Sequence, residues 1–515
     1  MIELVIGLVP FFPALAGFAL PAIYLTTRSR LAVMTYMNAA LAATLALSTL
    51  VALEAYRVDH PLIFKAGGWP APIGIVYVVD KFMALLGFVS AAIYLVIGLY
   101  SVSYIVDEGY PWYAVLLLGN ACGVLGVIYT GDLFNLFVML EVTSVSSYAL
   151  VMYYRHRADS VFSALKYAFI GSLGTTLYLL AMGLVYAYYG TLNLVDFSYR
   201  VNEVHGAPAQ YAFGAIMVLA LWAFAIKSGV FPNHFWLPDA HPAAPTPISA
   251  LLSGLVVNTG VVGLYKVLHI ATWNLESGVL ASTRSTVAIA SIVMGSLSAI
   301  VGALLMFIQT DVKRLIAYST VMNLGYLFMS VGCLSPTGLQ ATIYYVITHS
   351  LAKATLFLSA GVFIKIAGSR DLNKLWGLGS KEPVAGIALA ISTLTLAGVP
   401  PLPGFLAKLL LYEALFEVNP ALAILMVVAS AIGLLSYMRL FYTVILEAPT
   451  IQPKKIDFKL AKVTLTLMTI VLVVTGAIFL FVPQVFEAIV VKATKQASIN
   501  IREYVEYVYR TLVRP

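Results

Sequence analysis

The chain has 515 residues, of which 61% are hydrophobic and 10% are charged, and its mean hydropathy is +0.93. Soluble domains are about 45–50% apolar and about 25% charged, so this composition excludes a soluble fold and indicates a polytopic membrane protein. The net charge is +7, but the basic residues are scattered through connections, which excludes a nucleic-acid-binding face. The two cysteines, Cys122 and Cys333, cannot supply the ligands of an iron–sulfur cluster, and we expect no cofactor and no metal.

Apolar segments long enough to cross a bilayer follow one another along almost the whole chain. A span needs about 20 apolar residues, and the sequence predicts about fourteen of them in an all-α fold. Their ranges are 3–25, 31–54, 80–105, 111–130, 132–154, 160–188, 208–231, 246–270, 285–309, 314–333, 338–366, 383–400, 420–446 and 461–485. The first lacks the basic segment of a signal peptide, so we expect it to be a retained span.

Two segments differ from this pattern. Residues 55–79 are rich in proline and glycine, which predicts a short hairpin or loop. Residues 486–515 mix charged and apolar side chains and are too charged to span. This tail is predicted to form an amphipathic helix on the membrane surface or against a partner subunit.

The basic residues predict the orientation in the membrane. The connections after spans 1, 5, 9, 11 and 13 carry fourteen of them: Arg28, Arg30, Arg155, Arg157, Lys313, Arg314, Lys365, Arg370, Lys374, Lys381, Lys454, Lys455, Lys459 and Lys462. The connections on the other side carry four: Arg57, Lys65, Arg200 and Arg284. Because basic connections stay inside, we expect the odd-numbered ones on the cytoplasmic side of a prokaryotic cell membrane. An even number of spans then places both termini outside.

Seven basic residues belong neither to the connections nor to the tail: Lys81, Lys166, Lys227, Lys266, Lys353, Lys408 and Arg439. Glu141 lies in the middle of the fifth predicted span. A charge at mid-bilayer costs about 2.5–3.5 kcal/mol, so such residues face a hydrated interior and typically mark an ion or proton path. Burial makes a lysine easier to deprotonate and a nearby carboxylate does the opposite, so Glu141 and Lys227 could exchange a proton between them. The alternative is a static ion pair that fixes helix packing. Lys81, beside Asp80 at a span end, and Arg439 are expected to reach the membrane interface instead.

Two predicted spans contain a break beside a lysine. Lys227 comes just before Gly229-Val-Phe-Pro232, and Lys408 follows Gly398-Val-Pro-Pro401. Proline interrupts a helix, and such breaks at membrane depth are tolerated where they line a polar cavity.

The order of the motifs predicts an internal repeat. Ser163-Ala-Leu-Lys166 has the same spacing as Ser350-Leu-Ala-Lys353, and a broken span follows each. The chain then begins with an N-terminal part of three spans, 1–105. Two repeats of five spans come next, at 111–272 and 285–446, and the last span and the tail come after them. Repeats that lie five spans apart enter the membrane from opposite sides, which is the inverted arrangement of secondary transporters.

Histidines near these lysines are candidates for proton relay. His349 lies four residues before Lys353 on the same helix face, and histidine gives and takes protons near neutral pH. The alternative is a hydrogen-bonded core histidine. His234 and His241 flank the first break, and without a third ligand they argue against zinc. The predicted path comprises Glu141, Lys227, Lys266, His349, Lys353 and Lys408, with Lys166, His241, His234 and Asp80 as further candidates.

Four stretches resemble a known family. They are Gly131-Asp-Leu-Phe-Asn-Leu-Phe-Val-Met-Leu-Glu141, the block from Lys227 to Ala250, Asp311-Val-Lys-Arg-Leu-Ile-Ala-Tyr-Ser319 and Gly404-Phe-Leu-Ala-Lys408. They are similar to the antiporter-like subunits, which include the D subunit of Mrp-type sodium/proton antiporters and the proton-pumping membrane subunits of respiratory complex I and of membrane-bound hydrogenases. The resemblance covers about residues 110–415, and the run after Gly131 looks closest to the branch of the Mrp D subunit and the hydrogenases.

The resemblance implies fourteen spans with two inverted five-span repeats. It also implies that Glu141 modulates Lys227, that Lys266 and His349 continue a hydrated path, and that Lys408 exchanges protons in the second half.

We therefore expect a proton- or cation-translocating subunit of a membrane complex that also contains other membrane subunits. The chain has no redox centre of its own. Few glutamines and cysteines hint at a thermophile, which favours a redox-driven complex with a hydrogenase or reductase module. The alternatives are the D subunit of an Mrp-type sodium/proton antiporter, in which sodium is also moved, and a structural subunit that moves no ions.

Overall fold

The computed structural model describes residues 2–448 and 459–513. Lys454 and Lys455, which contribute to the predicted orientation, lie outside them. Within the described residues, thirteen helical segments are long and apolar enough to cross a membrane. The first six are α1 (Ile2–Thr27), α2 (Arg30–Arg57), α3 (Lys81–Tyr104), α4 (Tyr110–Tyr129), α5 (Leu133–Val151, extended to Tyr154 by a 3₁₀ turn) and α6 (Ala158–Tyr189). They confirm the first six predicted spans.

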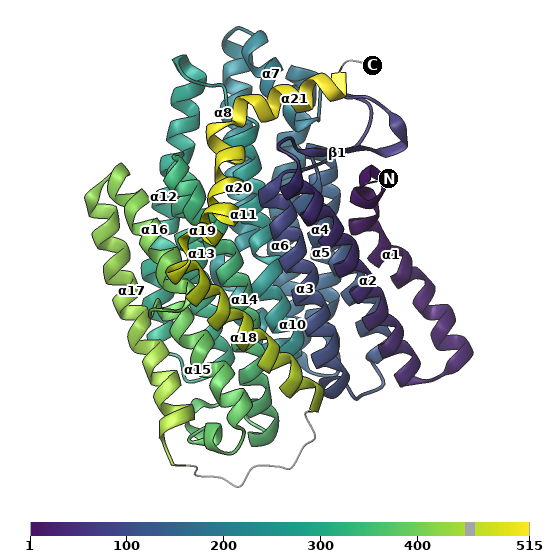
Figure 1. Ribbon diagram of the computed structural model, residues 1–515, viewed down its shortest axis with the longest axis vertical. Helices are drawn as coiled ribbons and strands as arrows, with labels where there is room; N and C mark the ends of the chain where they lie inside the picture. Colours follow the sequence, from purple (N-terminus) through teal and green to yellow (C-terminus); the bar gives the residue numbers. More distant parts are fainter. Residues whose placement is uncertain (1, 449–458, 514–515) are drawn as a thin grey trace.

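The other seven follow the same order. They are α8 (Ala207–Ser228) continued by α9 (Leu237–Ala243); α10 (Thr246–Leu251) with α11 (Asn258–Tyr265) and two π-helical segments; α12 (Gly278–Phe307); α13 (Val312–Gly332); α14 (Pro336–Ala367); α17 (Pro420–Phe441) with π-helical Tyr442–Leu446; and α18 (Lys459–Phe481). The predicted span 383–400 is a shorter apolar helix, α15 (Pro383–Ala397), and a second short helix, α16 (Pro403–Val418), follows it. The predicted polytopic helical fold is confirmed (Figure 1).

The two predicted breaks separate pairs of shorter helices. Each first helix ends at a glycine in the left-handed conformation, Gly229 after α8 (φ 63°) and Gly398 after α15 (φ 86°). Residues with a Cβ atom rarely adopt this conformation, and prolines follow both glycines, so neither helix can continue. Each break leaves free main-chain carbonyl groups at the end of its first helix.

The segment 55–79 is a hairpin, as predicted. Its strands β1 (Leu62–Lys65) and β2 (Val76–Val79) are antiparallel, with Leu62 opposite Val79. The hairpin lies at the same end of the bundle as α7 (Leu194–Glu203), the start of α1 and the tail (Figure 1).

The tail contains the predicted amphipathic helix, but its apolar face packs on this chain. α21 (Ile501–Val513) lies across the end of the bundle (Figure 1), and its Tyr504, Val505, Val508 and Leu512 side chains are buried. The Tyr509 and Tyr199 rings are 4.2 Å apart, which joins α21 to α7. Between α18 and α21, the tail forms the short helices α19 (Pro483–Phe486) and α20 (Lys492–Thr494) with π-helical turns.

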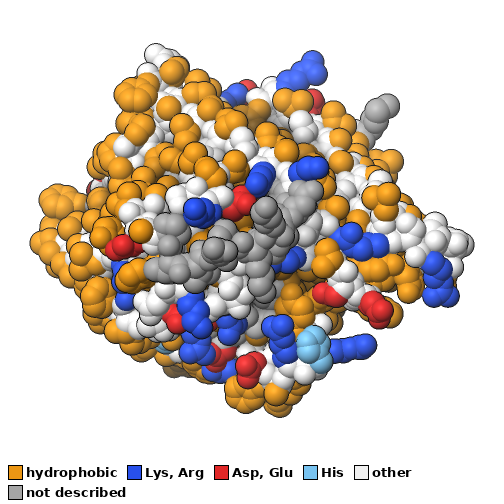
Figure 2. All heavy atoms as spheres, turned by 90° about the horizontal axis from the view of Figure 1, so that it is seen from below, with side chains coloured by type: hydrophobic (Ala, Val, Ile, Leu, Met, Phe, Trp, Pro, Cys, Tyr) orange, Lys and Arg blue, Asp and Glu red, His pale blue; other side chains and the backbone are white. Residues whose placement is uncertain are grey.

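The surface divides as a membrane protein requires. Seen from the end opposite the hairpin, hydrophobic side chains dominate the rim, while lysine, arginine, aspartate and glutamate gather toward the middle (Figure 2). The apolar rim suits a hydrocarbon environment, and the charged centre suits water at the end of the bundle.

We predict that Gly404→Ala destabilises the second break. A Cβ atom at Gly404 would overlap with the carbonyl oxygen of Thr395, which belongs to the helix before the break. Such overpacking costs about 1–3 kcal/mol, so the melting temperature of the purified complex should fall. Gly183→Ala in α6 is the control because no atom lies within 4 Å of its added Cβ. Equal melting temperatures for the two variants would contradict the close approach of the two helices.

Candidate functional site

Four lysines of the predicted path are buried inside the bundle. The exposed fractions are 7% for Lys227, 2% for Lys266, 0% for Lys353 and 4% for Lys408. Each ammonium group donates to hydroxyl or main-chain carbonyl oxygens, and within the described part of the chain none forms an ion pair with a carboxylate. A buried charge is costly unless it is hydrogen-bonded, so these neutral oxygens are what hold the lysines in place.

Lys227 lies in the last turn of α8, next to the first break. The C-terminal turn of a helix carries a partial negative charge that stabilises a cation. The Lys227 ammonium group donates to the Ser144 hydroxyl of α5 at 2.6 Å. The break therefore places Lys227 at a helix end inside the bundle, which offsets part of the cost of burying its charge.

Glu141 and Lys227 are neighbours but not an ion pair. Glu141 is half-buried on α5, one turn before Ser144. Its carboxylate is close enough to Lys227 to attract the charge of the ammonium group. The structure thus brings the two predicted residues together, with a serine hydroxyl in direct contact with the lysine.

Lys408 lies on α16, directly after the second break. Its ammonium group donates to the Ala397 carbonyl at the end of α15 at 3.1 Å and to the Ser430 hydroxyl of α17 at 2.6 Å. It also lies 5.8 Å from the centre of the Tyr326 ring, within the range of a cation–π interaction. The carbonyl that the break leaves free therefore becomes a partner of Lys408.

Lys266 caps another helix end. Its ammonium group donates to the carbonyl oxygens of Val127, Ile128 and Thr130 at 2.8, 2.9 and 2.5 Å, where α4 ends. Asp80 is 1% exposed and caps the start of α3 by accepting the Met83 amide at 2.7 Å. Its carboxylate is the acidic group close enough to act on Lys266.

His349 and Lys353 lie side by side on α14, completely buried. Both ring nitrogens of His349 are without a hydrogen-bond partner. Lys353 donates to the Ile316 carbonyl at 3.2 Å and to the Ser319 hydroxyl, both on α13. The neighbouring Ser350 hydroxyl accepts from the Asn258 amide of α11 at 2.9 Å. Lys353 and His349 therefore stand at the contact of α11, α13 and α14.

Polar side chains continue from Lys353 toward Lys408. The Asn323 amide donates to the Ser319 carbonyl at 2.5 Å, and the Tyr345 hydroxyl donates to the Asn323 side-chain oxygen at 2.5 Å. The Tyr345 ring is 6.2 Å from that of Tyr326, the ring beside Lys408. We call Lys353, Ser319, Asn323, Tyr345, Tyr326 and Lys408 the polar chain.

Two of the further candidates lie away from the polar chain. Lys166 is 27% exposed and forms an ion pair with Asp239 at 2.7 Å, which Arg314 also contacts at 2.6 Å. His234 is half-buried, with its ring 5.6 Å from that of Phe231. Lys166 lies near the beginning of α6 and Lys353 near the middle of α14, so the matching Ser-x-x-Lys motifs do not occupy matching places in two helices of 32 residues each.

Lys81 lies at the end of the bundle, with its ammonium group 3.6 Å from the Asp59 carboxylate, which is 91% exposed. The Lys81 side chain is 2% exposed and donates to the Val58 carbonyl at 2.7 Å, because the tail covers this end of α3. The Gln496 side chain of the tail accepts from the Lys81 main-chain amide at 2.9 Å. Arg439 is half-buried and donates to the Gln309 carbonyl at the end of α12, in agreement with a position near the end of its span.

Sequence reasoning missed Lys313, which it counted among the connections. Lys313 is 3% exposed and donates to the Ala244 carbonyl at 2.7 Å and to the Ser249 hydroxyl at 3.1 Å. Its place right after the helix cap Asp311 resembles that of an exposed residue, so the sequence carried no signal of its burial. The neutral members of the polar chain, such as Asn323 and Tyr345, also gave no signal among many polar residues in spans.

Comparisons with known proteins identify the family of the chain. Residues 130–433 match the family described as "NADH:quinone oxidoreductase/Mrp antiporter, TM". The chain is 31% identical over 437 residues to the D subunit of the Na(+)/H(+) antiporter of Alkalihalophilus pseudofirmus, covering 83% of this chain and 84% of that protein. The chain belongs to this family. It is accordingly a cation-translocating membrane subunit, as the resemblance predicts.

Other relatives and solved structures extend the comparison. The N subunit of the NADH-quinone oxidoreductase of Desulforudis audaxviator is 30% identical over 439 residues, covering 84% of this chain and 83% of that protein. A chain of the archaeal membrane-bound sulfane sulfur reductase superposes with a TM-score of 0.89 at 26% identity, covering 98% and 99% of the two chains. A chain of the Mrp complex from Dietzia sp. DQ12-45-1b shares the fold, with a TM-score of 0.84 at 23% identity and 99% of both chains covered.

We predict that Lys266→Met destabilises the protein. The substitution leaves three buried carbonyl groups at the end of α4 without their donor, and each such loss costs about 1–3 kcal/mol. Lys166→Met, which removes a partly exposed ion pair, should cost no more than about 1 kcal/mol. The melting temperatures of the two purified variant complexes test this. A larger loss for Lys166→Met would show that Lys266 does not cap α4.

Proposed function

We propose that this chain moves protons across the membrane through the buried side chains that connect Lys227 with Lys408. The polar chain is the observation that carries the proposal. It joins two buried lysines, Lys353 and Lys408, through hydroxyl, amide and aromatic groups that lie on three packed helices, α13, α14 and α16. Ionisable residues held inside a membrane protein usually mark such a route.

The lysines are suited to exchange protons because their partners are neutral. Each donates to hydroxyl or carbonyl oxygens, which can hold an ammonium group but do not neutralise it as a carboxylate would. Deprotonation then leaves a neutral amine in a buried site, which is the state that burial favours. Proton transfer requires groups that take up and release a proton, and a buried lysine among neutral partners is such a group.

Glu141 supplies the variable charge in the first half. It is half-buried, so a change in its surroundings can alter the field at Lys227. From Lys227 the route passes to the contact of α8 and α11, where the Ser228 hydroxyl donates to the Val257 carbonyl at 2.9 Å. The next residue, Asn258, contacts Ser350 beside His349 and Lys353. Lys266 and Asp80 form a side branch of this proposed proton route.

Two inverted five-span repeats are part of the proposal. The helices α6 and α14 have 32 residues each, and both end at a left-handed glycine, Gly190 and Gly368. The helices before them, α5 and α13, both begin at a capping aspartate, Asp132 and Asp311. These features support repeats at about 111–272 and 285–446.

The orientation in the membrane is also part of the proposal. The start of α1 and helix α21 lie at one end (Figure 1), which supports termini on a common side, and we propose the outer side of a prokaryotic cell membrane. When the buried Lys313 is left out of the count, the connections at the opposite end of the bundle still carry more basic residues than those at the end with the termini.

We propose a redox-driven complex as the setting, with a reductase or hydrogenase module and other membrane subunits as partners. The likeness to the sulfane sulfur reductase complex, over nearly the whole of both chains, supports it. The second candidate is the D subunit of a sodium/proton antiporter, which the relatives at 31% and 32% identity favour. The buried lysines disfavour a subunit that moves no ions, because burying several ammonium groups is costly for a subunit that only packs against its neighbours.

We predict that Lys227→Met, Glu141→Ala and Lys353→Met each abolish proton movement while the complex still assembles. Each removes one titratable group of the route and leaves the helices intact. Proton uptake by proteoliposomes containing the purified complex, followed with a pH-sensitive dye, measures the effect.

Lys462→Met is the control, since Lys462 is 43% exposed and pairs with Glu382 at the end of the bundle. Normal proton uptake by Lys353→Met would remove the polar chain from the mechanism. Loss of assembly in all three variants, with Lys462→Met intact, would assign these residues to packing.

We predict that mass spectrometry of the complex purified in mild detergent finds iron–sulfur or nickel-site subunits beside this chain. Their presence identifies a redox-driven complex. A complex made only of antiporter-like and small membrane subunits would instead identify this chain as the D subunit of a gradient-driven antiporter.

A further inference from the structure

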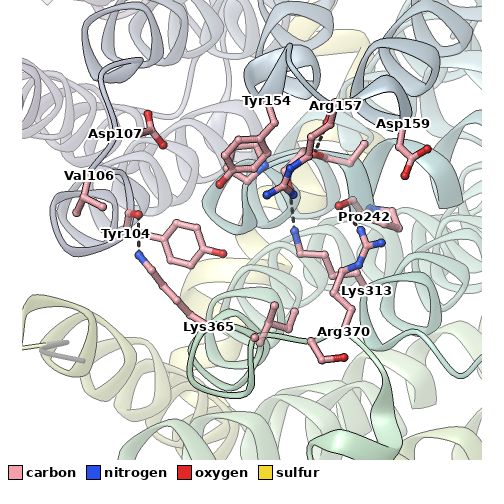
Figure 3. Close-up of a pocket in the computed structure, with 17 residues that line it drawn as sticks. Tyr104, Val106, Asp107, Tyr154, Arg157, Asp159, Pro242, Lys313, Lys365 and Arg370 are labelled. Carbon is pink, nitrogen blue, oxygen red and sulfur yellow. Dashed lines mark hydrogen bonds between the residues drawn. The ribbon is translucent and has the colours of Figure 1, made fainter. Parts of the chain in front are cut away.

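A cavity of about 500 Å³ opens at the end of the bundle opposite the hairpin and the tail. It collects the connections that follow α3, α5, α9 and α14 and the start of α13 (Figure 3). Arg157, Lys365, Arg370, Asp107 and Asp159 line it, so its wall is polar and predominantly basic. This is the end predicted to face the cytoplasm, and the cavity is the place where water-exposed groups come nearest to the buried Lys313.

Lys313 forms the inner wall of this cavity. Figure 3 shows its side chain among the lining residues, close to Arg157 and Arg370. Although it lines the cavity, it is 3% exposed, and its ammonium group donates to the Ala244 carbonyl at 2.7 Å and more weakly to the His241 carbonyl at 3.4 Å. Lys313 therefore contacts the cavity on one side and the segment that contains His241 on the other.

His241 is a buried imidazole without a fixed partner. Its side chain is 0% exposed, both ring nitrogens lack a hydrogen bond, and its ring stacks on that of Phe357 at 4.9 Å. Leaving a buried polar group unpaired costs about 1–3 kcal/mol, so we expect a buried water molecule or a transferred proton at this ring.

Two ammonium groups lie near His241. The charged groups close enough to act on its ring are Lys313 and Lys353. Lys353 lies one turn before Phe357 on α14, the residue on which the ring stacks. His241 thus stands between the inner wall of the cavity and the first residue of the polar chain.

We propose that this cavity is the aqueous opening of the proton route and that Lys313 and His241 carry protons from it to Lys353. The inference rests on the proposed function, because it supplies the entrance to the same polar chain. It adds Lys313, which sequence reasoning placed among exposed connections, and assigns a role to the unpaired ring of His241.

The transfer conserves protons at each step. Because neither ring nitrogen of His241 is hydrogen-bonded to Lys313 or Lys353, a water molecule carries each proton across. An N–H bond of the Lys313 ammonium group breaks to protonate this water, which gives a proton to the unprotonated ring nitrogen of neutral His241, leaving a neutral amine and an imidazolium. The other ring nitrogen then gives its proton to the neutral amine of Lys353, and the imidazole returns to a neutral form. Lys313 regains a proton from the water of the cavity.

Blocking the cavity tests the opening. Ser369 lines it, and Ser380 is exposed at the same end outside it. In a chain carrying Cys122→Ala and Cys333→Ala, Ser369→Cys and Ser380→Cys are each labelled to completion with a bulky cationic methanethiosulfonate before reconstitution. We expect labelled Ser369→Cys to lose most of its proton uptake and labelled Ser380→Cys to keep it. Full uptake by labelled Ser369→Cys would overturn the inference.

Two substitutions test the relay itself. Lys313→Arg keeps a charged donor for the carbonyls but cannot release a proton, and His241→Gln keeps a polar side chain without a titratable ring. We expect each to lower proton uptake about 100-fold in an assembled complex. The control is His269→Gln, because His269 is also buried but its Nε2 atom is bonded to the Val331 carbonyl at 2.9 Å.

The outcomes separate this inference from the proposed function. If Lys313→Arg and His241→Gln pump normally while Lys353→Met does not, protons enter elsewhere and the polar chain stands. If all three pump normally, the proposed function fails as well. Should His241→Gln fail to assemble, the labelling of Ser369→Cys still decides whether the cavity is the opening.

Discussion

The structure depends on holding ammonium groups inside an apolar bundle without carboxylates in contact with them. Removing such a charge from water is expensive, and the expense is met here by the carbonyl groups that helices leave unpaired at their C-terminal ends. Lys266 uses the end of α4, Lys408 the end of α15, and Lys313 the end of α9. These three lysines therefore lie where a helix ends, while Lys227 and Lys353 donate to hydroxyl groups of neighbouring helices.

This constraint explains why the fold contains so many short helices at membrane depth. A continuous helix satisfies its own carbonyl groups and has none to offer in its middle. The left-handed glycines Gly229 and Gly398 interrupt two spans and create such groups inside the bundle. The same breaks weaken local packing, and the close approach of Gly404 to Thr395 shows how tightly the neighbouring helices compensate.

Much of the fold could be predicted from sequence, because hydropathy, proline and glycine report directly on spans, breaks and the hairpin. The lysines of the path could be found as well, since charge inside an apolar run is conspicuous. The direction in which a side chain points could not be predicted from the sequence. Lys166 and Lys353 share a motif, yet one lies in a partly exposed ion pair and the other at the centre of the bundle. Lys313 and Lys81 lie at the ends of spans in the sequence, but tertiary contacts bury them. No local sequence pattern reports such contacts.

The bond between Gln496 and the start of α3 has a consequence for how the protein is made. The Gln496 side chain pairs with the Lys81 main-chain amide and with the Asp59 carbonyl, residues that leave the ribosome far earlier. Until the last part of the chain is synthesised, the early spans wait in the membrane with this end of α3 open to water. Closure of that end therefore waits until Gln496 has been synthesised and has packed back on the early spans, and a chain that stops before Gln496 lacks both bonds.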